Sequence, residues 1–396
     1  MAASQPDLVQ TPAQLTGLVD ELLAQKTFAI DIESNGYYHF VERTCILTIS
    51  TPTRDTVVDS LALWEHMQLL APAFSAQGVR VLCHGGSYDV ASLKRDFNYR
   101  FSHIDDTMIA AQLLGIEAIS LAALAARYLN ITLSKELQRH NWAERPLQQE
   151  HLQYLGGDTS HLFKLTAILQ KELEAKDLLE EYAIECRMLA AQPGANKAGV
   201  DPESFRRIKE ARSMTNAQRG SLRALVMLRD SIAKEMDLAP FRVIGNQTLV
   251  DIVYARPDTV AALSRLRGLS RRVLDNHAQA LVDAARQGLS EPQPERGPRD
   301  EDDSDWTMPA VRPGPETREV AKQIKAWRQT EALSRGIGLQ AVLPTPIINE
   351  IVRSAPQTLG ELGLISRLGE KRLNRYGQIL LGLAKPLTQL RRTDKV

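Results

Sequence analysis

The sequence predicts an α/β domain followed by two all-helical domains. Strand-like apolar runs alternate with helical patterns only in about the first 170 residues, and the remainder reads almost wholly as helix. A proline-rich acidic segment interrupts this helical remainder, and the stretches on its two sides are similar to each other. The length of 396 residues fits two to three domains.

The elements of the α/β part can be placed one after another. Thr11 is suited to cap a first helix that ends near Ala24, with Pro12 in its first turn. Gly85-Gly86 makes a tight turn into a helix that starts near Tyr88. Apolar runs that read as strands lie between these helices, at 28–33, 45–50, 56–59 and 79–84.

The helical part consists of two copies of one unit. A shift of 99 residues aligns them without a gap over more than forty positions, mostly apolar and at helical spacing, such as Leu263 with Leu362. Between them, residues 290–315 hold six prolines and a net charge of −4, which is typical of a flexible linker. The expected domains are therefore the α/β domain at 1–190, a first helical domain at 200–289, the linker at 290–315 and a second helical domain at 316–396.

The formal net charge of zero is a cancellation between two halves. Residues 1–190 carry 15 Lys+Arg and 24 Asp+Glu, whereas residues 191–396 carry 33 and 24. The acidic half is suited to gather carboxylates around a metal and the basic half to hold phosphates, although simple drift of surface charge is the other interpretation.

Cysteine usage and hydropathy predict a cytoplasmic protein. Cys45, Cys83 and Cys186 are odd in number and form no C-x-x-C pair, which argues against a disulfide framework and against a zinc site. A signal peptide pattern is missing, as is any apolar run of about 18 residues. We therefore expect no contact with membranes.

Three short motifs supply candidate catalytic residues. Asp31 and Glu33 are two positions apart on a strand and leave the same face, where a divalent cation would relieve their repulsion. Asp89 follows a strand end and a glycine turn, although the position also suits a helix-start carboxylate. Tyr154 and Asp158 are four apart on a helix and share a face, as a core tyrosine and a surface aspartate would.

In this order the motifs resemble those of the DEDD exonuclease superfamily, in its tyrosine-bearing branch. The stretches HIDDTMIAAQLLG and SLAALAARYLNITLSKELQRHNWAERPL are similar to the ribonuclease D family, and the C-terminal repeats resemble HRDC domains. The resemblance implies a ribonuclease H-like exonuclease domain, with a mixed sheet and flanking helices, followed by two all-α HRDC domains.

The resemblance also assigns roles to the motif residues. Asp31, Glu33, Asp89 and Asp158 would hold two divalent cations, Mg²⁺ or Mn²⁺, and Tyr154 would orient the attacking water. The implied reaction is hydrolysis of RNA from its 3′ end with release of 5′-mononucleotides.

Two departures from the family pattern concern positioning. Ser34-Asn35-Gly36 stands where many relatives have an aromatic residue after D-x-E, and Leu155-Gly156-Gly157 separates the tyrosine from the last aspartate. Neither departure removes a ligand. Asp106 matches a family aspartate that we interpret as the cap of a helix extending to Leu114.

The expected partner is RNA with a free 3′ end, which the resemblance implies is precursor tRNA, and no obligate protein partner is indicated. Basic residues crowd one end of each helical copy and are candidates for phosphate contacts, with a solvated basic face as the other interpretation. They are Arg265, Arg267, Arg271, Arg272, Arg367, Lys371, Arg372 and Arg375.

Two other functions remain open from the sequence. A DNA-directed 3′–5′ exonuclease of the same superfamily would carry the same motifs, since none of them reads a 2′-hydroxyl. A non-catalytic RNA-binding protein with a decayed nuclease domain would not be expected to keep the whole motif set. A helicase is disfavoured because no G-x-x-x-x-G-K-[ST] loop occurs.

Overall fold

A six-stranded mixed sheet forms the centre of the α/β domain. The computed structural model describes residues 5–134, 136–195, 199–294 and 314–388, apart from the side chains of residues 158 and 388. The strand order is β1-β4-β3-β2-β5-β6, so β2 lies inside the sheet, antiparallel to β3 and parallel to β5. The strands are β1 (Asp7–Val9), β2 (Thr27–Ser34), β3 (Thr44–Ser50), β4 (Asp55–Asp59), β5 (Arg80–Cys83) and β6 (Ile104–Asp106).

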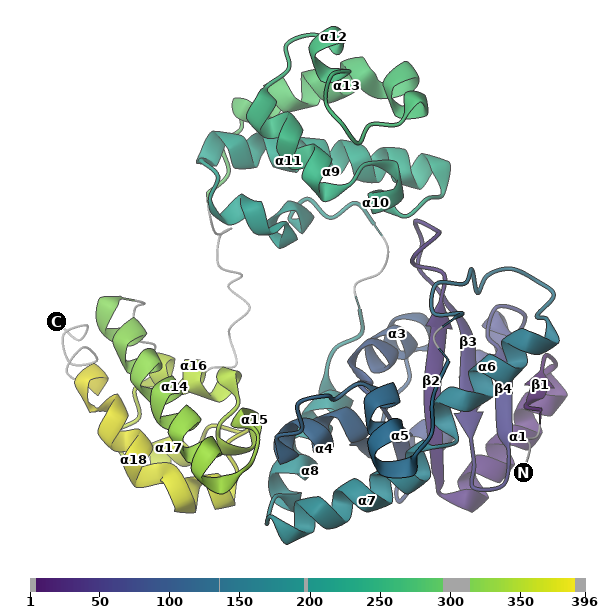
Figure 1. The fold of residues 1–396 in the computed structure, drawn as a ribbon, viewed down its shortest axis with the longest axis vertical. Coiled ribbons are helices and arrows are strands. Elements are labelled where there is room, and N and C mark those ends of the chain that lie inside the picture. Colours follow the sequence, from purple (N-terminus) through teal and green to yellow (C-terminus); the bar gives the residue numbers. More distant parts are fainter. Residues whose placement is uncertain (1–4, 135, 196–198, 295–313, 389–396) are drawn as a thin grey trace.

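Helices cover both faces of this sheet (Figure 1). The predicted caps are confirmed: the Thr11 side chain accepts from the Gln14 amide, and that of Asp106 accepts from the Met108 and Ile109 amides. The helices are α1 (Pro12–Gln25), α2 (Ala71–Ser75), α3 (Ser87–Phe97), α4 (Thr107–Leu114), α5 (Leu121–Leu129), α6 (Gln149–Thr159), α7 (Leu162–Ala175) and α8 (Leu179–Ala191), with a 3-10 helix at Trp64–Leu70.

Strand β2 divides its side chains between the two faces. Phe28, Ile30 and Ile32 enter the main apolar core, together with the leucines of α1. Ala29 points to the opposite face and packs against Leu162 of α7. Because side chains alternate along a strand, Asp31 and Glu33 share this second face with Ala29.

The two helical domains have the same internal plan. Each helix of the second domain begins 99 residues after its counterpart in the first, as from Asn216 to Pro315. The first domain holds α9 (Asn216–Met236), α10 (Pro240–Val243), α11 (Asn246–Ala255), α12 (Val260–Leu263) and α13 (Arg271–Leu289), preceded by 3-10 turns at Ser204–Arg207 and Lys209–Arg212. The second holds α14 (Pro315–Arg335), α15 (Leu339–Val342), α16 (Thr345–Ser354), α17 (Leu359–Gly363) and α18 (Glu370–Thr388).

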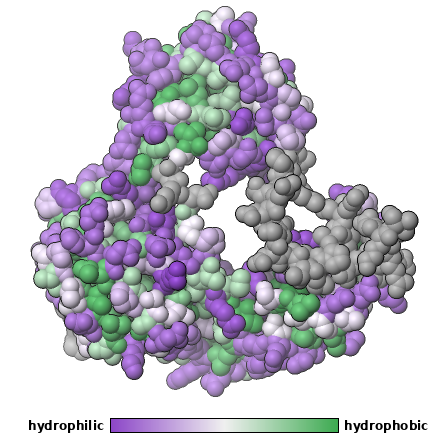
Figure 2. Space-filling view, turned by 180° about the vertical axis from the view of Figure 1, so that it is seen from behind, coloured by the Kyte–Doolittle hydropathy of each residue, from purple (hydrophilic) through white to green (hydrophobic). Residues whose placement is uncertain are grey.

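The helical domains contact the α/β domain in different ways. The second shares one continuous apolar core with α4, α7 and α8, and its Gly338 amide donates to the Leu113 carbonyl at 2.8 Å. The first has a core of its own, against which Phe40 of the β2–β3 loop packs. In the space-filling view most of the visible surface of the described residues is hydrophilic, with smaller hydrophobic areas between (Figure 2).

Other expectations can be compared with the described residues. Cys45, Cys83 and Cys186 are buried free thiols. Within the described ranges, no helix has the length and apolar character needed to span a bilayer. The expected linker at 290–315 lies for the most part outside the described residues, since 295–313 are not among them.

Candidate active site

The two carboxylates of β2 line a cavity on the second face of the sheet. This cavity has a volume of 550 Å³, and its walls include Asp31, Glu33, His84, Arg139 and Tyr154. The pairing of β2 with β3 is regular at Asp31 and Glu33, and it shifts register between Glu33 and Ser34. The irregularity therefore lies directly after the second carboxylate, before the last residue of the strand, Ser34.

Asp89 is brought to the same region from helix α3. It lies in the first turn of α3 and is 7% exposed. Burial, together with the nearby charges of Asp31 and Asp106, raises the pKa of Asp89 well above its usual value. The chain therefore places a buried carboxyl close to Asp31, where it resists ionisation unless positive charge is near.

The glycine turn before α3 explains how Asp89 reaches this position. Gly85 has a φ of +67°, and a Cβ on Gly86 would lie 2.5 Å from the Cys83 sulfur. Asp106 accepts hydrogen bonds from the Gly85 and Gly86 amides at 3.0 and 2.8 Å. Since its oxygens also cap α4, the structure supports the expected capping role of Asp106.

His84, the residue directly after β5, belongs to the cavity wall. Its Nδ1 lies 2.9 Å from the Thr107 hydroxyl. Burial lowers the pKa of His84, against the opposing influence of Asp106. A neutral imidazole therefore lines the wall next to the β2 carboxylates.

Tyr154 and Asp158 both lie on α6, one turn apart. Tyr154 lines the cavity, and its ring is stacked against Trp142 with the centroids 5.9 Å apart. The backbone of Asp158 lies in the last turn of α6, and its side chain is outside the described set. A Cβ on Gly156 would lie 2.6 Å from Cγ of Pro6, which accounts for one of the two helical glycines. Nothing described lies within 4 Å of a Cβ on Gly157, and the structure gives no reason for it.

The described donors fit part of a divalent metal site. Asp31 and Glu33 face the cavity together, and Asp89 is buried near Asp31. Hard cations prefer such carboxylate oxygens, and a cation here would favour the ionised form of Asp89. Among the described side chains, which exclude that of Asp158, no three His, Cys, Asp or Glu residues gather closely enough to form a complete site.

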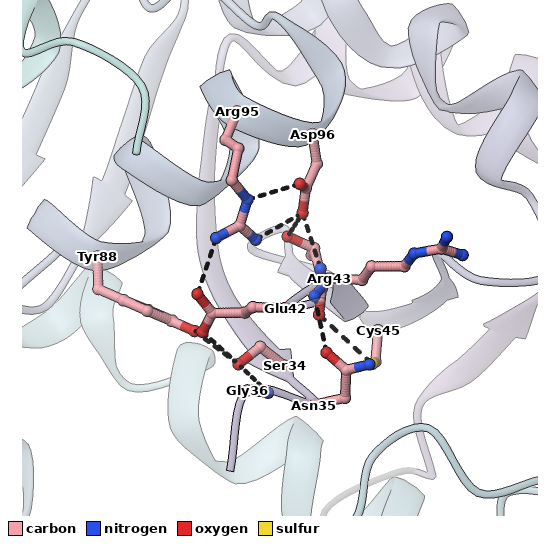
Figure 3. Close-up of polar contacts among 10 residues, drawn as sticks. Ser34, Asn35, Gly36, Glu42, Arg43, Cys45, Tyr88, Arg95 and Asp96 are labelled. Carbon is pink, nitrogen blue, oxygen red and sulfur yellow. Dashed lines mark hydrogen bonds and ion pairs between the residues drawn. The ribbon is translucent and has the colours of Figure 1, made fainter. Parts of the chain in front are cut away.

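A polar network fixes the segment that follows Glu33 (Figure 3). The Ser34 and Tyr88 hydroxyls are 2.6 Å apart, and both bond to the Glu42 carboxylate. Buried Arg95 holds Glu42 at 2.8 Å, and Asp96 at 2.7 Å on its other side. The β2–β3 loop is therefore pinned at its base to α3, the helix that carries Asp89.

The eight basic residues proposed for RNA contact have different surroundings. Arg265, Arg267, Arg271 and Arg272 are exposed, around α12 and the start of α13. Figure 1 places α12 on the side of the first helical domain away from the sheet. These four arginines are accessible to a phosphate backbone.

The candidates in the second helical domain are engaged with the protein itself. Arg367 pairs with Glu185 at 3.0 Å, and Arg375 pairs with Asp177 at 3.2 Å. Lys371 pairs with the same Asp177. Arg372 is 1% exposed and donates to the carbonyls of Gln340, Ala341 and Arg367. These four basic groups hold the second helical domain together and against α8 and the turn that precedes it, which does not favour a role in RNA contact.

Sequence reasoning missed one whole wall of the cavity. The segment between α5 and α6 contributes Leu133, Ser134, Gln138 and Arg139 to the lining. The segment belongs to a stretch that is similar to the ribonuclease D family, but the resemblance assigned no role to these four residues.

Family models match most of the chain. Residues 6–174 match the model described as 3′-5′ exonuclease, and residues 218–284 and 317–383 match the HRDC domain model. The matched helical ranges correspond to the two copies described above.

Relatives and solved structures agree with these matches. Protein RRP6-like 2 of Arabidopsis thaliana is 30% identical over 71% of this chain and 33% of its own length. The catalytic core of RRP6 from Trypanosoma brucei is 26% identical, with a TM-score of 0.62 over 72% of this chain and 80% of that one. Escherichia coli RNase D, 21% identical, shares the fold with a TM-score of 0.68 over 96% and 99% of the two chains. The chain spans less than half the length of the curated relatives it matches.

Proposed function

We propose that this chain, which carries a DEDD-type 3′–5′ exonuclease domain and HRDC domains, is an exoribonuclease that removes 5′-mononucleotides from the 3′ end of RNA. The observation that carries the proposal is the cavity in which Asp31 and Glu33 of β2 face Tyr154 of α6. Buried Asp89 stands close to Asp31. The exoribonuclease relatives support the choice of RNA.

The expected cofactor is a pair of divalent cations, Mg²⁺ or Mn²⁺. Asp31, Glu33, Asp89 and Asp158 are the residues we assign to hold them, since all four are carboxylates and oxygen ligands suit both metals. Bound there, the cations would supply Lewis-acid stabilisation of the charge that develops on the phosphodiester oxygens.

Residues of the chain itself orient the attacking water and position the 3′-terminal nucleotide. The Tyr154 hydroxyl is assigned to orient the attacking water by a hydrogen bond, because its phenol reaches the same cavity as the β2 carboxylates. Stacking on Trp142 restricts the ring and so fixes the direction of that hydroxyl. Neutral His84 and the Arg139 segment line the wall against which the 3′-terminal nucleotide would lie.

The proposal also names the RNA substrate and the residues that bind its phosphates. We assign precursor tRNA as the RNA that is trimmed, and Arg265, Arg267, Arg271 and Arg272 as phosphate contacts distant from the cavity. For the second helical domain we assign a structural role in place of phosphate contact, since its basic residues pair with Asp177 and Glu185. We expect action in the cytoplasm, in keeping with three buried free cysteines.

One incubation tests the proposal. Purified protein is mixed with a 3′-extended tRNA precursor, labelled at the 5′ end, with Mg²⁺ or with EDTA. We expect a ladder of products shortened from the 3′ end, released 5′-mononucleotides and no reaction in EDTA. Matched DNA and a 3′-phosphorylated RNA serve as controls, since the proposal expects both to be degraded more slowly. Internal cleavage, or equal degradation of DNA, would contradict it.

A further inference from the structure

Two aromatic rings are exposed at the junction between the exonuclease domain and the first HRDC domain. Tyr37 belongs to the β2–β3 loop and is 45% exposed, and Phe241 belongs to α10 and is 47% exposed. Their centroids are 5.0 Å apart and their planes are inclined by 57°, so the two rings do not cover each other's faces. Aromatic surface remains open to solvent on both sides of the junction.

These rings are not what chiefly joins the two domains. The junction is made by His39 with Asp237 at 2.8 Å and by the Ala239 amide, which donates to the Tyr38 carbonyl at 3.2 Å. Phe40 packs against the apolar core of the HRDC domain. Tyr37 and Phe241 are held in place by these neighbours while keeping large parts of their rings accessible.

A cation accompanies the aromatic pair. The Arg242 guanidinium lies 4.7 Å from the Tyr38 ring centroid and 5.8 Å from that of Tyr37. The Arg242 side chain is itself exposed. Exposed aromatic faces beside an arginine are the combination that holds single-stranded nucleic acid, because bases stack on the rings and phosphates meet the cation.

The same group is continuous with the proposed active site. The Tyr38 hydroxyl donates to the Arg139 carbonyl at 2.6 Å, and Arg139 lines the cavity of Asp31 and Glu33. At its base, the β2–β3 loop is pinned through Glu42 to Tyr88, next to Asp89 (Figure 3). The loop thus runs from the carboxylate strand to the rings, and both of its ends are fixed.

We propose that Tyr37, Tyr38, Phe241 and Arg242 form an interdomain platform on which bases of the single-stranded 3′ segment stack, upstream of the nucleotide being removed. The proposal rests on the proposed function, since it takes the cavity as the place of hydrolysis. It gives the contact between the two domains a role: the platform exists only when the loop and α10 meet. Because stacking does not read base edges, the platform would hold any sequence.

Binding in EDTA tests the platform separately from hydrolysis. The full chain is titrated into a 5′-labelled oligoadenylate of about 12 nucleotides, longer than a single platform needs, and fluorescence anisotropy gives the Kd. We expect Tyr37→Ala and Phe241→Ala each to weaken binding by about tenfold, and Tyr37→Phe to restore it. Tyr254→Ala is the matched control, since Tyr254 is 51% exposed in the same HRDC domain but belongs to α11.

An abasic substitution decides whether the rings touch bases. One base at a time is removed from the oligomer, and the loss of affinity is compared between the wild-type chain and Tyr37→Ala. We expect that removal of the base at one position near the 3′ end lowers the affinity of the wild-type chain. The same removal should change the affinity of the Tyr37→Ala variant only slightly. Identical abasic profiles in the two proteins, or wild-type affinity in both alanine variants, would overturn the platform. A protein that hydrolyses no RNA yet shows the expected profile would refute the proposed function alone.

Discussion

The segment between α5 and α6 should depend on one buried ion pair for its position. Arg145 near its end donates to both oxygens of Asp59 at the end of β4, with Nη2–Oδ1 at 2.6 Å and Nε–Oδ2 at 2.8 Å. The Asp59 side chain is 1% exposed, and that of Arg145 is 26% exposed. The same segment supplies the cavity wall around Arg139, so this ion pair connects stability with the site.

Asp59→Asn should lower the free energy of unfolding by about 2–3 kcal/mol at neutral pH. Loss of one partner from a buried pair costs roughly 3–5 kcal/mol, and the amide retains one acceptor for Arg145. Urea unfolding followed by circular dichroism measures the difference. Asp7→Asn is the control: its pair with Arg54 is 59% and 39% exposed, and an exposed pair contributes less than about 1 kcal/mol.

The pH dependence of this difference follows from the direction of the pKa shift. Burial alone would raise the pKa of Asp59, but hydrogen bonds from Arg145, the Ala62 amide and Gln10 bring it below its usual value. A lowered folded-state pKa stabilises the protein above the unfolded-state pKa, and this contribution disappears as the pH falls through the folded-state pKa. The gap between wild type and Asp59→Asn should therefore stay constant from about pH 8 to 5 and shrink only below about pH 4. A gap under about 1 kcal/mol at neutral pH, or one that closes between about pH 8 and 6, would refute the reasoning.

Three further predictions concern the helical domains. Gly338→Ala should detach the second HRDC domain from α4, because the new Cβ would lie 1.7 Å from the Gln112 carbonyl oxygen; small-angle scattering should show a larger radius of gyration, and an unchanged profile would contradict the shared core. Arg372→Ala should lower stability by about 3 kcal/mol, since it leaves three carbonyls, one buried and two partly buried, without this donor. Exposed Arg267→Ala should leave stability within about 0.5 kcal/mol and reduce the salt dependence of RNA binding by about one phosphate contact. Equal losses of stability in Arg372→Ala and Arg267→Ala would contradict the assignment of Arg372 to a structural role and of Arg267 to phosphate contact.

Much of the fold could be predicted from local signals in the sequence. Thr11 and Asp106 mark helix starts through side chains that bond to nearby amides, and such caps act within a few residues. The repeat was equally visible, because a shared core demands apolar residues at the same helical positions. Strands β1 and β6 were not predicted, since three residues are too few to display alternation.

Contacts between distant segments could not be predicted from these signals. The basic end of the second HRDC domain suggested phosphate binding, yet its partners Asp177 and Glu185 are nearly two hundred residues away in sequence. Gly156 is required by Pro6 at the other end of the domain. For the candidate site, the spacing of Asp31 with Glu33 predicted a shared face, while the approach of Asp89 to Asp31 depends on the order of strands in the sheet.

The central claim is that the carboxylates of β2 carry out hydrolysis at the RNA 3′ end. Asp31→Asn tests it most directly, because the side chain keeps its size and loses its charge. We expect release of 5′-mononucleotides from a 3′-extended RNA to fall by roughly a thousandfold, since several kcal/mol of transition-state stabilisation would be lost, with the melting temperature unchanged or raised. Asp20→Asn, an exposed acid on α1, should retain the wild-type rate. A wild-type rate of mononucleotide release in a folded Asp31→Asn protein would contradict the claim.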